Sequence, residues 1–292
     1  ELENIDCLMV WHKKVNKEFL KNFKKLKFVV RYGVGYDNID LKILKKKKID
    51  FSNNPDYGVE EVSDSTVAMI LNFTRQINRY NFLSKSYRSG WQENTLPFIK
   101  RSSKTKVGII GLGRIGSSVA KRLKSFNFDI TFYDPFLESG VEKVFYLKRT
   151  FDLNYLLKVS DVITLHCPLT KKTKNIVNKS FLERMKPKSI LINTARGGLI
   201  ESSSLLYFYL KNNHLRSVGL DVLPDEPPNS KDLLIKDWLN CNKWLKGRLI
   251  INPHVAYYSK SSWNEMRVKA AETVKLFFKK GIHRNKILDK YE

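Results

Sequence analysis

The chain has 292 residues, of which 42% are hydrophobic and 28% charged, so it can bury a substantial core in one large or two ordinary domains. It has no run of about 18 apolar residues and no basic, apolar signal-like start, which disfavours a membrane-spanning or exported protein and predicts a cytoplasmic one. Its formal net charge of +24 would suit a nucleic-acid-binding protein, but the lysines are spread over every segment without a recognition motif, so anionic small ligands are favoured.

The first part of the chain is predicted to be a small α/β unit. Strands are expected at "CLMV" (7–10), "FVV" (28–30) and "IDF" (49–51), with helices over Val15–Lys25 and Leu41–Lys48. The four lysines that end the second helix indicate a solvent-exposed end. Because only three strands are present, we expect this domain to be incomplete at its N-terminus.

The rest of the chain alternates strands with helices, which is typical of a parallel sheet with helices on both faces. A long helix is expected over Glu60–Tyr80, and a closing amphipathic helix over Ser262–Lys279. Between them are six strand candidates: "KVGII" (106–110), "ITFY" (130–133), "VITLH" (162–166), "SILIN" (189–193), "SVGLDV" (217–222) and "LIIN" (249–252). The predicted class is therefore α/β.

A glycine pattern after the first of these strands indicates a dinucleotide site. Gly111, Gly113 and Gly116 have G-x-G-x-x-G spacing, a helix is expected to begin near Arg114, and Asp134 ends the next strand. The glycines would allow a tight turn, close approach of a pyrophosphate and close helix packing, respectively. Asp134 would accept hydrogen bonds from the adenosine ribose and repel a 2'-phosphate. The pattern therefore favours NAD over NADP.

Three chemically active side chains follow the last three predicted strands. Arg196, Glu226 and His254 would converge if the strand order is the usual 3-2-1-4-5-6, because the carboxyl ends of neighbouring parallel strands share one edge. An arginine can pair with a carboxylate and polarise a carbonyl, and a histidine oriented by a glutamate can transfer a proton. With a nicotinamide, this set suits hydride transfer to a 2-oxo acid. Taken singly, each residue has another reading: Arg196 as a cofactor ligand, Glu226 as a surface acid and His254 as a strand cap.

Several motifs together resemble the D-isomer-specific 2-hydroxyacid dehydrogenase family. They are "RYGVGYDNID", "GLGRIG", "YDP", "INTARGGL", "GLDVLPDEPP" and "INPHVAYYS", in family order over nearly the whole chain. The resemblance implies that Arg196 binds substrate, that His254 is the acid/base and that Glu226 is its acidic partner. It also implies that Arg31 and the backbone of Val34 and Gly35 bind the substrate.

The same resemblance implies further ligand contacts. Tyr257 stands where a related branch of the family has a tryptophan that contacts the substrate side chain. The implied cofactor contacts beyond the three glycines and Asp134 are Arg114, Ile115, Pro168, Thr173, Thr194, Ala195 and Asp221. Of these, Asp221 would approach the nicotinamide carboxamide, and Pro168 and Thr173 would lie near the adenosine half. No metal site is expected, and Cys7, Cys167 and Cys241 lack the spacing of a zinc site or disulfide framework.

The resemblance also implies the domain organisation. A Rossmann cofactor domain (57–261) would be inserted in a smaller flavodoxin-like substrate domain (1–56 and 262–292), with the active-site cleft between them. Family members are usually dimers joined through the cofactor domain, so a homodimer is expected and the Glu60–Tyr80 helix is a candidate for its interface rather than for the interior.

Two functions are compatible with these motifs. The first is an NAD-dependent oxidoreductase that interconverts a D-2-hydroxy acid and its 2-oxo acid. The alternative is an NADH-sensing interaction protein, because "YDPFLESGVE" and "PHVAYYS" most resemble the branch that contains the C-terminal-binding corepressors. Glu226 disfavours a formate dehydrogenase, in which glutamine is the histidine's partner.

Overall fold

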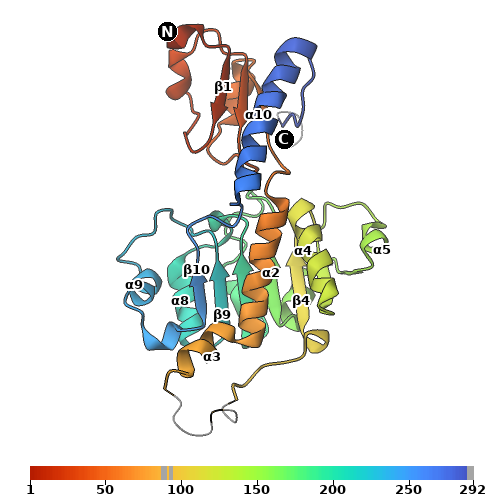
Figure 1. Cartoon of the computed structure of the whole chain (residues 1–292), viewed down its shortest axis with the longest axis vertical. Helices are drawn as coiled ribbons and strands as arrows, with labels where there is room; N and C mark the ends of the chain where they lie inside the picture. The colour runs from red at the N-terminus through yellow and green to blue at the C-terminus, as the bar shows by residue number, and fades with distance from the viewer. Residues whose placement is uncertain (87–90, 92–94, 288–292) are drawn as a thin grey trace. The chain divides into compact units, whose positions relative to one another are not determined.

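The computed structural model describes residues 1–86, 91 and 95–287, and the chain divides into two compact units (Figure 1). Unit 1 comprises Glu1–Gly58 together with the chain from Tyr258 onward, and unit 2 comprises Val59–Tyr257. The divisions thus fall after Gly58 and after Tyr257, whereas the sequence placed them after residues 56 and 261. Among the described residues, no helix combines the length and apolar character needed to cross a bilayer.

Unit 1 contains a parallel three-stranded sheet in the order β1-β2-β3 within its described residues. Its strands and helices are β1 (Cys7–Val10), β2 (Phe28–Arg31), α1 (Leu41–Lys46), β3 (Asp50–Asn53) and α10 (Lys260–Lys280). Ala270, Val274 and Phe277 of α10 pack against Phe28 and Val30 of β2, which confirms the apolar stripe predicted for this helix. Residues of α1 pack with a second apolar cluster that includes Val29 and Phe51.

The helix predicted over Val15–Lys25 is wrong. Only a short 3-10 helix forms there, over Phe19–Asn22. The backbone of Val15 pairs instead with the segment at Ile39: its amide donates to the carbonyl of Asn38, and its carbonyl accepts from the amide of Asp40. Both backbone groups are thereby used in an extended pairing, which the local helical pattern could not reveal.

Unit 2 is built on a parallel sheet that has seven strands within the described residues, in the order β10-β9-β8-β7-β4-β5-β6 (Figure 1). This is the order 3-2-1-4-5-6, counted along the unit, with β10 added beside the sixth strand. The elements are α2 (Val59–Arg75), α3 (Ile77–Leu83), β4 (Lys106–Ile110), α4 (Arg114–Ser125), β5 (Asp129–Tyr133), α5 (Val141–Phe145), β6 (Lys148–Arg149), α6 (Leu153–Val159), β7 (Val162–Leu165), α7 (Lys179–Arg184), β8 (Ser189–Asn193), α8 (Ser203–Lys211), β9 (Leu215–Leu220), α9 (Leu233–Leu239) and β10 (Leu249–Ile251).

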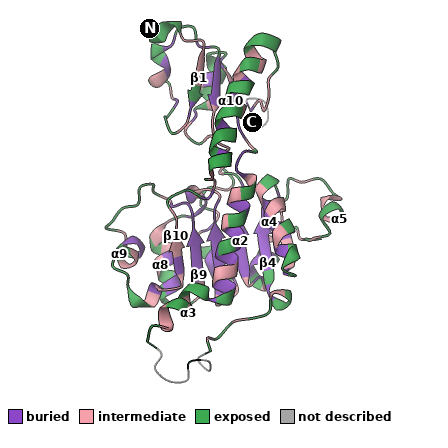
Figure 2. Cartoon of the chain, in the orientation of Figure 1, coloured by how far each residue is buried: buried purple, intermediate pink, exposed green. Residues whose placement is uncertain are grey.

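Helices cover both faces of this sheet, as predicted for the α/β class. On one face α2 and α4 pack over the strands through a cluster that includes Phe73 and Leu123 (Figure 1). On the other face, helices that include α6, α7 and α8 contribute to a second cluster with Leu156, Leu182 and Leu206. The strands between the two layers are largely buried (Figure 2). The six predicted strands are confirmed.

The helix predicted over Glu60–Tyr80 is interrupted. It runs to Arg75, Gln76 adopts a left-handed conformation with φ of 54°, and α3 begins at Ile77. The buried Gln76 side chain donates to the carbonyl of Pro97 at 2.7 Å, a contact that favours the break. Met69, Ile70 and Phe73 of α2 are buried against the sheet of the same chain. The prediction that this helix serves a dimer interface rather than the interior is therefore wrong for the face of α2 that carries these residues.

Candidate active site

The glycine loop has the conformation that its spacing predicts. Gly111 has φ of 91°, and a Cβ there would lie 2.7 Å from the amide nitrogen of Cys167. A Cβ on Gly116 would collide with the carbonyl oxygen of Gly111, whereas one on Gly113 would meet no heavy atom within 4 Å. Gly113 caps α4, which begins at Arg114, so unpaired amides of a helix N-terminus adjoin that open space. The loop therefore fits a dinucleotide pyrophosphate.

Asp134 stands directly after β5 and is held from two sides. Its Oδ2 accepts the amide of Leu112 in the glycine loop at 3.0 Å, and its Oδ1 accepts the amide of Phe136 at 3.1 Å. A carboxylate has about four lone-pair sites, so both oxygens can accept further hydrogen bonds. This geometry fits recognition of a ribose diol next to the pyrophosphate site.

Arg114 and Ile115 begin α4, and four further predicted cofactor residues lie in two local loops. Thr173 donates to the carbonyl of Pro168 at 2.6 Å, which joins both residues in one turn after β7. Thr194 is buried, and its hydroxyl meets that of Thr66 of α2 at 2.8 Å. The amide of Ala195 donates to the Asn193 side chain at 3.0 Å and is therefore already paired.

Asn193 shapes the loop that presents Arg196 at the end of β8. Its side chain accepts the Ala195 amide and donates to the Arg196 carbonyl at 2.8 Å, closing the loop on both sides. Arg196 is partly buried, and one of its Nη atoms donates to the Ala195 carbonyl at 2.6 Å. Gly197 was not singled out from the sequence, yet a Cβ there would collide with the carbonyl oxygen of Leu223. The Arg196 loop and the loop after β9 therefore touch.

Glu226 and His254 form the central pair of the site. Oε2 of Glu226 lies 2.8 Å from Nδ1 of His254, and Oε1 accepts the amide of Leu223 at 2.9 Å. The pair is partly exposed, at 43% for His254 and 39% for Glu226, so a substrate can reach the ring. β9 and β10 are neighbours in the sheet, which places the two loops together as the strand-order argument predicted.

Asp221 has a role that sequence reasoning missed. It is buried, and its carboxylate accepts the amides of Val255 and Ala256 at 3.0 Å, while its carbonyl accepts the amide of His254 at 2.8 Å. His254 itself has a left-handed backbone with φ of 55°. Asp221 thus fixes the histidine loop. No local motif marks this contact, because the partners are 34 and 35 residues away in sequence.

The charge state of Glu226 assigns the protons in this pair. Burial alone would raise the pKa of Glu226, but hydrogen bonds from His254 and the Leu223 amide, with the nearby charges of His254 and Arg196, lower that pKa below its ordinary value. An ionised carboxylate only accepts, so Nδ1 of His254 carries the hydrogen. In the neutral ring, Nε2 is then the nitrogen without a hydrogen.

The substrate-binding residues predicted in unit 1 lie around its glycine loop. Nε of Arg31 donates to Asn38 at 2.9 Å, and Asn38 in turn donates to the carbonyls of Trp11 and Lys13. A Cβ on Gly33 would collide with the Arg31 guanidinium, which therefore lies against the loop of Val34 and Gly35. Asn38 was not identified from the sequence. Tyr257 is partly buried at the end of unit 2.

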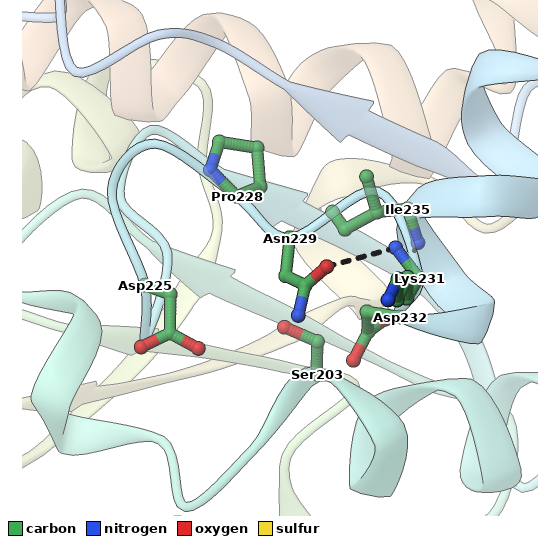
Figure 3. A pocket seen from close by; sticks show the side chains of 7 residues that line it. All are labelled: Ser203, Asp225, Pro228, Asn229, Lys231, Asp232 and Ile235. Carbon is green, nitrogen blue, oxygen red and sulfur yellow. Dashed lines mark hydrogen bonds between the residues drawn. The ribbon is translucent and has the colours of Figure 1, made fainter.

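A small pocket lies beside the Glu226 loop. It has a volume of about 250 Å³ and is lined by Ser203, Asp225, Pro228, Asn229, Lys231, Asp232 and Ile235 (Figure 3). Within the lining, the Lys231 amide donates to the Asn229 side chain at 2.9 Å. Arg196, Glu226 and His254 are not among these lining residues, so the pocket is separate from the pair.

His166 lies beneath the glycine loop and should make stability depend on pH. Desolvation lowers the pKa of His166 from 6.5 to about 3. Between these values the unfolded chain binds a proton that the folded chain does not, so this residue's contribution to the free energy of unfolding should fall with decreasing pH by about 1.4 kcal/mol per pH unit. Urea unfolding near pH 7 and near pH 5 would measure it. His166→Gln should weaken the dependence, and an equal dependence in both proteins would contradict this assignment.

Taken together, the glycine loop and Asp134 define a dinucleotide-binding α/β fold that carries a histidine–carboxylate pair at the carboxyl edge of its sheet. Residues 67–256 match the family model described as "D-isomer specific 2-hydroxyacid dehydrogenase, NAD binding domain". This match spans more than half of the chain and includes every site residue described above for unit 2 except Thr66 and Tyr257. The chain belongs to the D-isomer specific 2-hydroxyacid dehydrogenase family, and unit 2 is its NAD-binding domain.

Individual relatives agree with this membership. The chain is 37% identical over 238 residues to D-3-phosphoglycerate dehydrogenase of Methanocaldococcus jannaschii, covering 81% of this chain and 45% of that protein. It is 32% identical over 279 residues to C-terminal-binding protein 1 of Caenorhabditis elegans, covering 94% and 37%. The chain therefore spans less than half the length of these relatives. Among solved structures, D-lactate dehydrogenase from Aquifex aeolicus, complexed with NAD and lactic acid, superimposes with a TM-score of 0.83 at 31% identity, covering 98% and 88% of the two chains.

Proposed function

We propose that this protein is an NAD-dependent oxidoreductase that interconverts a D-2-hydroxy acid and its 2-oxo acid. The observation that carries the proposal is the Glu226–His254 hydrogen bond of 2.8 Å. It lies at the edge of the sheet where the Arg196 loop leaves β8, the neighbour of β9. The similarity to dehydrogenases of D-hydroxy acids supports the same reaction class.

In this proposal His254 is the acid/base. During reduction, Nε2 of the protonated ring gives its proton to the oxygen of the reacting carbonyl, and in the opposite direction the neutral ring takes the hydroxyl proton. Glu226 stabilises the charged ring through Nδ1. Asp221 is a positioning residue, because its carboxylate fixes the backbone that carries the imidazole.

Arg196 is the group that would bind the substrate carboxylate and polarise the adjacent carbonyl. Its planar fork can make two parallel hydrogen bonds to a carboxylate, and its fixed positive charge favours the negative charge that develops on the reacting oxygen. The contacts that the family resemblance assigns to Arg31, Val34, Gly35 and Tyr257 stay predictions.

The residues that would hold NAD are those of the glycine loop and Asp134, with Pro168, Thr173 and Asp221 as further predicted contacts. When bound, the reduced cofactor supplies the hydride that the side chains here cannot provide. The open space at Gly113 and the two available oxygens of Asp134 are the observations that fit this cofactor.

The test of the proposed function is NADH consumption with a panel of 2-oxo acids that range from pyruvate to branched and aromatic members. We expect turnover with at least one of them, together with formation of the D-hydroxy acid, measured by chiral chromatography. Formation of the L-isomer, or no turnover with any member by a protein that binds NADH, would contradict the proposal.

Cofactor choice is a separate prediction. The unaltered protein should prefer NADH to NADPH, because the Asp134 carboxylate repels a 2'-phosphate. Asp134→Ala should weaken NADH binding by about tenfold, the size expected for hydrogen bonds to a charged group. Calorimetric titration of both cofactors would show this. The control is Asp129→Ala, which removes the same charge from the other end of β5 and should leave both affinities unchanged. Equal binding of NADH and NADPH by the unaltered protein would refute the role assigned to Asp134.

A second candidate function is supported by the similarity to C-terminal-binding protein 1 of Caenorhabditis elegans over 94% of this chain. An NADH-sensing interaction protein would bind the cofactor through the same loop without needing turnover. The oxo-acid panel separates the two functions, because only the enzyme consumes NADH. We also propose, from family resemblance and composition, a homodimer and a cytoplasmic location.

A further inference from the structure

Arg149 places a charge inside the edge of unit 2, where the sequence predicted no structural element. It belongs to β6, a strand of two residues at the sheet edge that pairs with β5, the strand that directly precedes Asp134. Its side chain is only 5% exposed. The guanidinium carbon lies 5.7 Å from the ring centroid of Phe132 and 4.4 Å from that of Phe151. A charge buried this far needs partners that compensate for lost water.

The partners of Arg149 are the backbone of the loop that follows β5. One Nη atom donates to the carbonyls of Asp134 at 2.9 Å and Leu137 at 2.6 Å. The other donates to the carbonyl of Glu138 at 2.9 Å and lies 3.5 Å from a carboxylate oxygen of Glu142. Four acceptors therefore occupy the four hydrogens on the two Nη atoms.

These contacts bear on the cofactor because the loop carries Asp134. The Asp134 carboxylate also accepts the amide of Phe136 within the same loop, so its direction depends on the loop's conformation. We propose that Arg149 is the positioning residue that holds Asp134 ready for the adenosine ribose and thereby sets the preference for NAD. This inference rests on the proposed NAD-dependent function.

The same contacts indicate that Arg149 does not bind a 2'-phosphate directly. An arginine that binds such a phosphate must direct its fork at it. Here both Nη atoms are committed to the loop, and Nε has no hydrogen-bond partner and is buried among the described residues. Arg149 favours NAD through preorganisation of the loop, which lowers the entropy lost when a ligand binds.

The experiment compares Arg149→Met and Arg149→Lys with Lys148→Met. Lys148 is the other residue of β6, is 69% exposed and pairs with Asp129, so its replacement removes the same charge without touching the loop. The affinities for NADH and NADPH are measured by calorimetric titration without substrate, and kcat and KM are measured with NADH and a 2-oxo acid. Thermal unfolding is followed for each protein.

We expect Arg149→Met to weaken NADH binding by about tenfold, with NADPH binding nearly unchanged, so that the discrimination between them falls by the same factor. The KM for NADH should rise while kcat at saturating NADH is retained. The NADH affinity of Arg149→Lys should lie between those of the unaltered protein and Arg149→Met, because one ammonium group cannot bond to all four acceptors at these positions. Lys148→Met should match the unaltered protein.

Other results would overturn the inference. Lower thermal stability with unchanged cofactor discrimination would make Arg149 a structural residue only. A larger loss for NADPH than for NADH would make it a phosphate ligand. If Arg149→Met does not fold, unchanged discrimination in Arg149→Lys is the contradicting result. If the unaltered protein fails to bind NADH, the proposed function is refuted as well. If the unaltered protein binds NADH and the Arg149 variants discriminate between NADH and NADPH equally well, only this inference is refuted.

Discussion

Replacing His254 by glutamine is expected to lower turnover by about 100- to 10,000-fold, the usual contribution of a positioned acid/base group. Glutamine can keep a hydrogen bond to Glu226 but cannot give up and recover a proton. NADH affinity should be almost unchanged, because the dinucleotide site is built from the glycine loop and Asp134. Steady-state kinetics and calorimetric titration would check both parts, and an active glutamine variant would make His254 structural.

The pH dependence of the unaltered protein gives an independent check of the same residue. Reduction should fall as pH rises, because His254 must begin protonated, and oxidation should fall as pH drops, because it must begin neutral. The ionised carboxylate of Glu226 lies 2.8 Å from Nδ1 of His254, so its negative charge stabilises the protonated ring.

Glu226→Gln should therefore move both pH limbs to lower pH. Its matched control is Asp225→Asn, the same chemical change at the adjacent residue, whose side chain lines the separate pocket (Figure 3). The control should keep the limbs of the unaltered protein. Reductive and oxidative profiles at saturating cofactor would be recorded for all three proteins, and an unmoved reductive limb in Glu226→Gln would separate Glu226 from the chemistry.

Arg196→Lys should lower kcat/KM by about 10- to 100-fold, the range expected when hydrogen bonds to a charged group are lost. The lysine keeps the positive charge but loses the planar fork, so both substrate affinity and turnover should suffer. NADH affinity should persist. Arg184→Lys, at an exposed position on α7, is the matched control and should behave as the unaltered protein.

Two outcomes would reassign Arg196. Normal turnover by the lysine variant would show that the fork does not meet the substrate. Loss of NADH binding with substrate affinity intact would instead make Arg196 a cofactor ligand, the alternative that its sequence position left open. Initial rates at varied substrate and cofactor distinguish these cases from the predicted one.

The dinucleotide loop could be predicted well because its requirements are local. The positive φ of Gly111 and the contact between Gly116 and the Gly111 carbonyl both arise within six residues of chain, and only glycine satisfies them. The strands were likewise predictable, since buried parallel strands consist of continuous apolar runs such as β7 and β8.

Sequence patterns failed where a distant partner overrides a local preference. The segment from Val15 has a helical pattern, but pairing at Ile39 keeps its start extended. The predicted long helix ends where Gln76 adopts a left-handed conformation, and the Gln76 side chain bonds to the distant carbonyl of Pro97. β6 consists of two basic residues, which carry no strand signal, and it exists because Thr131 and Phe132 of β5 pair with it.

By itself, the sequence determined which chemical groups this protein has and which strand end each one follows: a glycine loop, an aspartate after β5, and Arg196, Glu226 and His254 near the sheet edge. Only the tertiary structure decided how they are held. Glu226 meets His254 across 28 residues, Asp221 fixes the histidine loop across 35, and Arg149 holds the Asp134 loop across 15. Such contacts depend on the register of neighbouring parallel strands and on which loops those strands bring within hydrogen-bonding distance, and no local spacing in the chain encodes either.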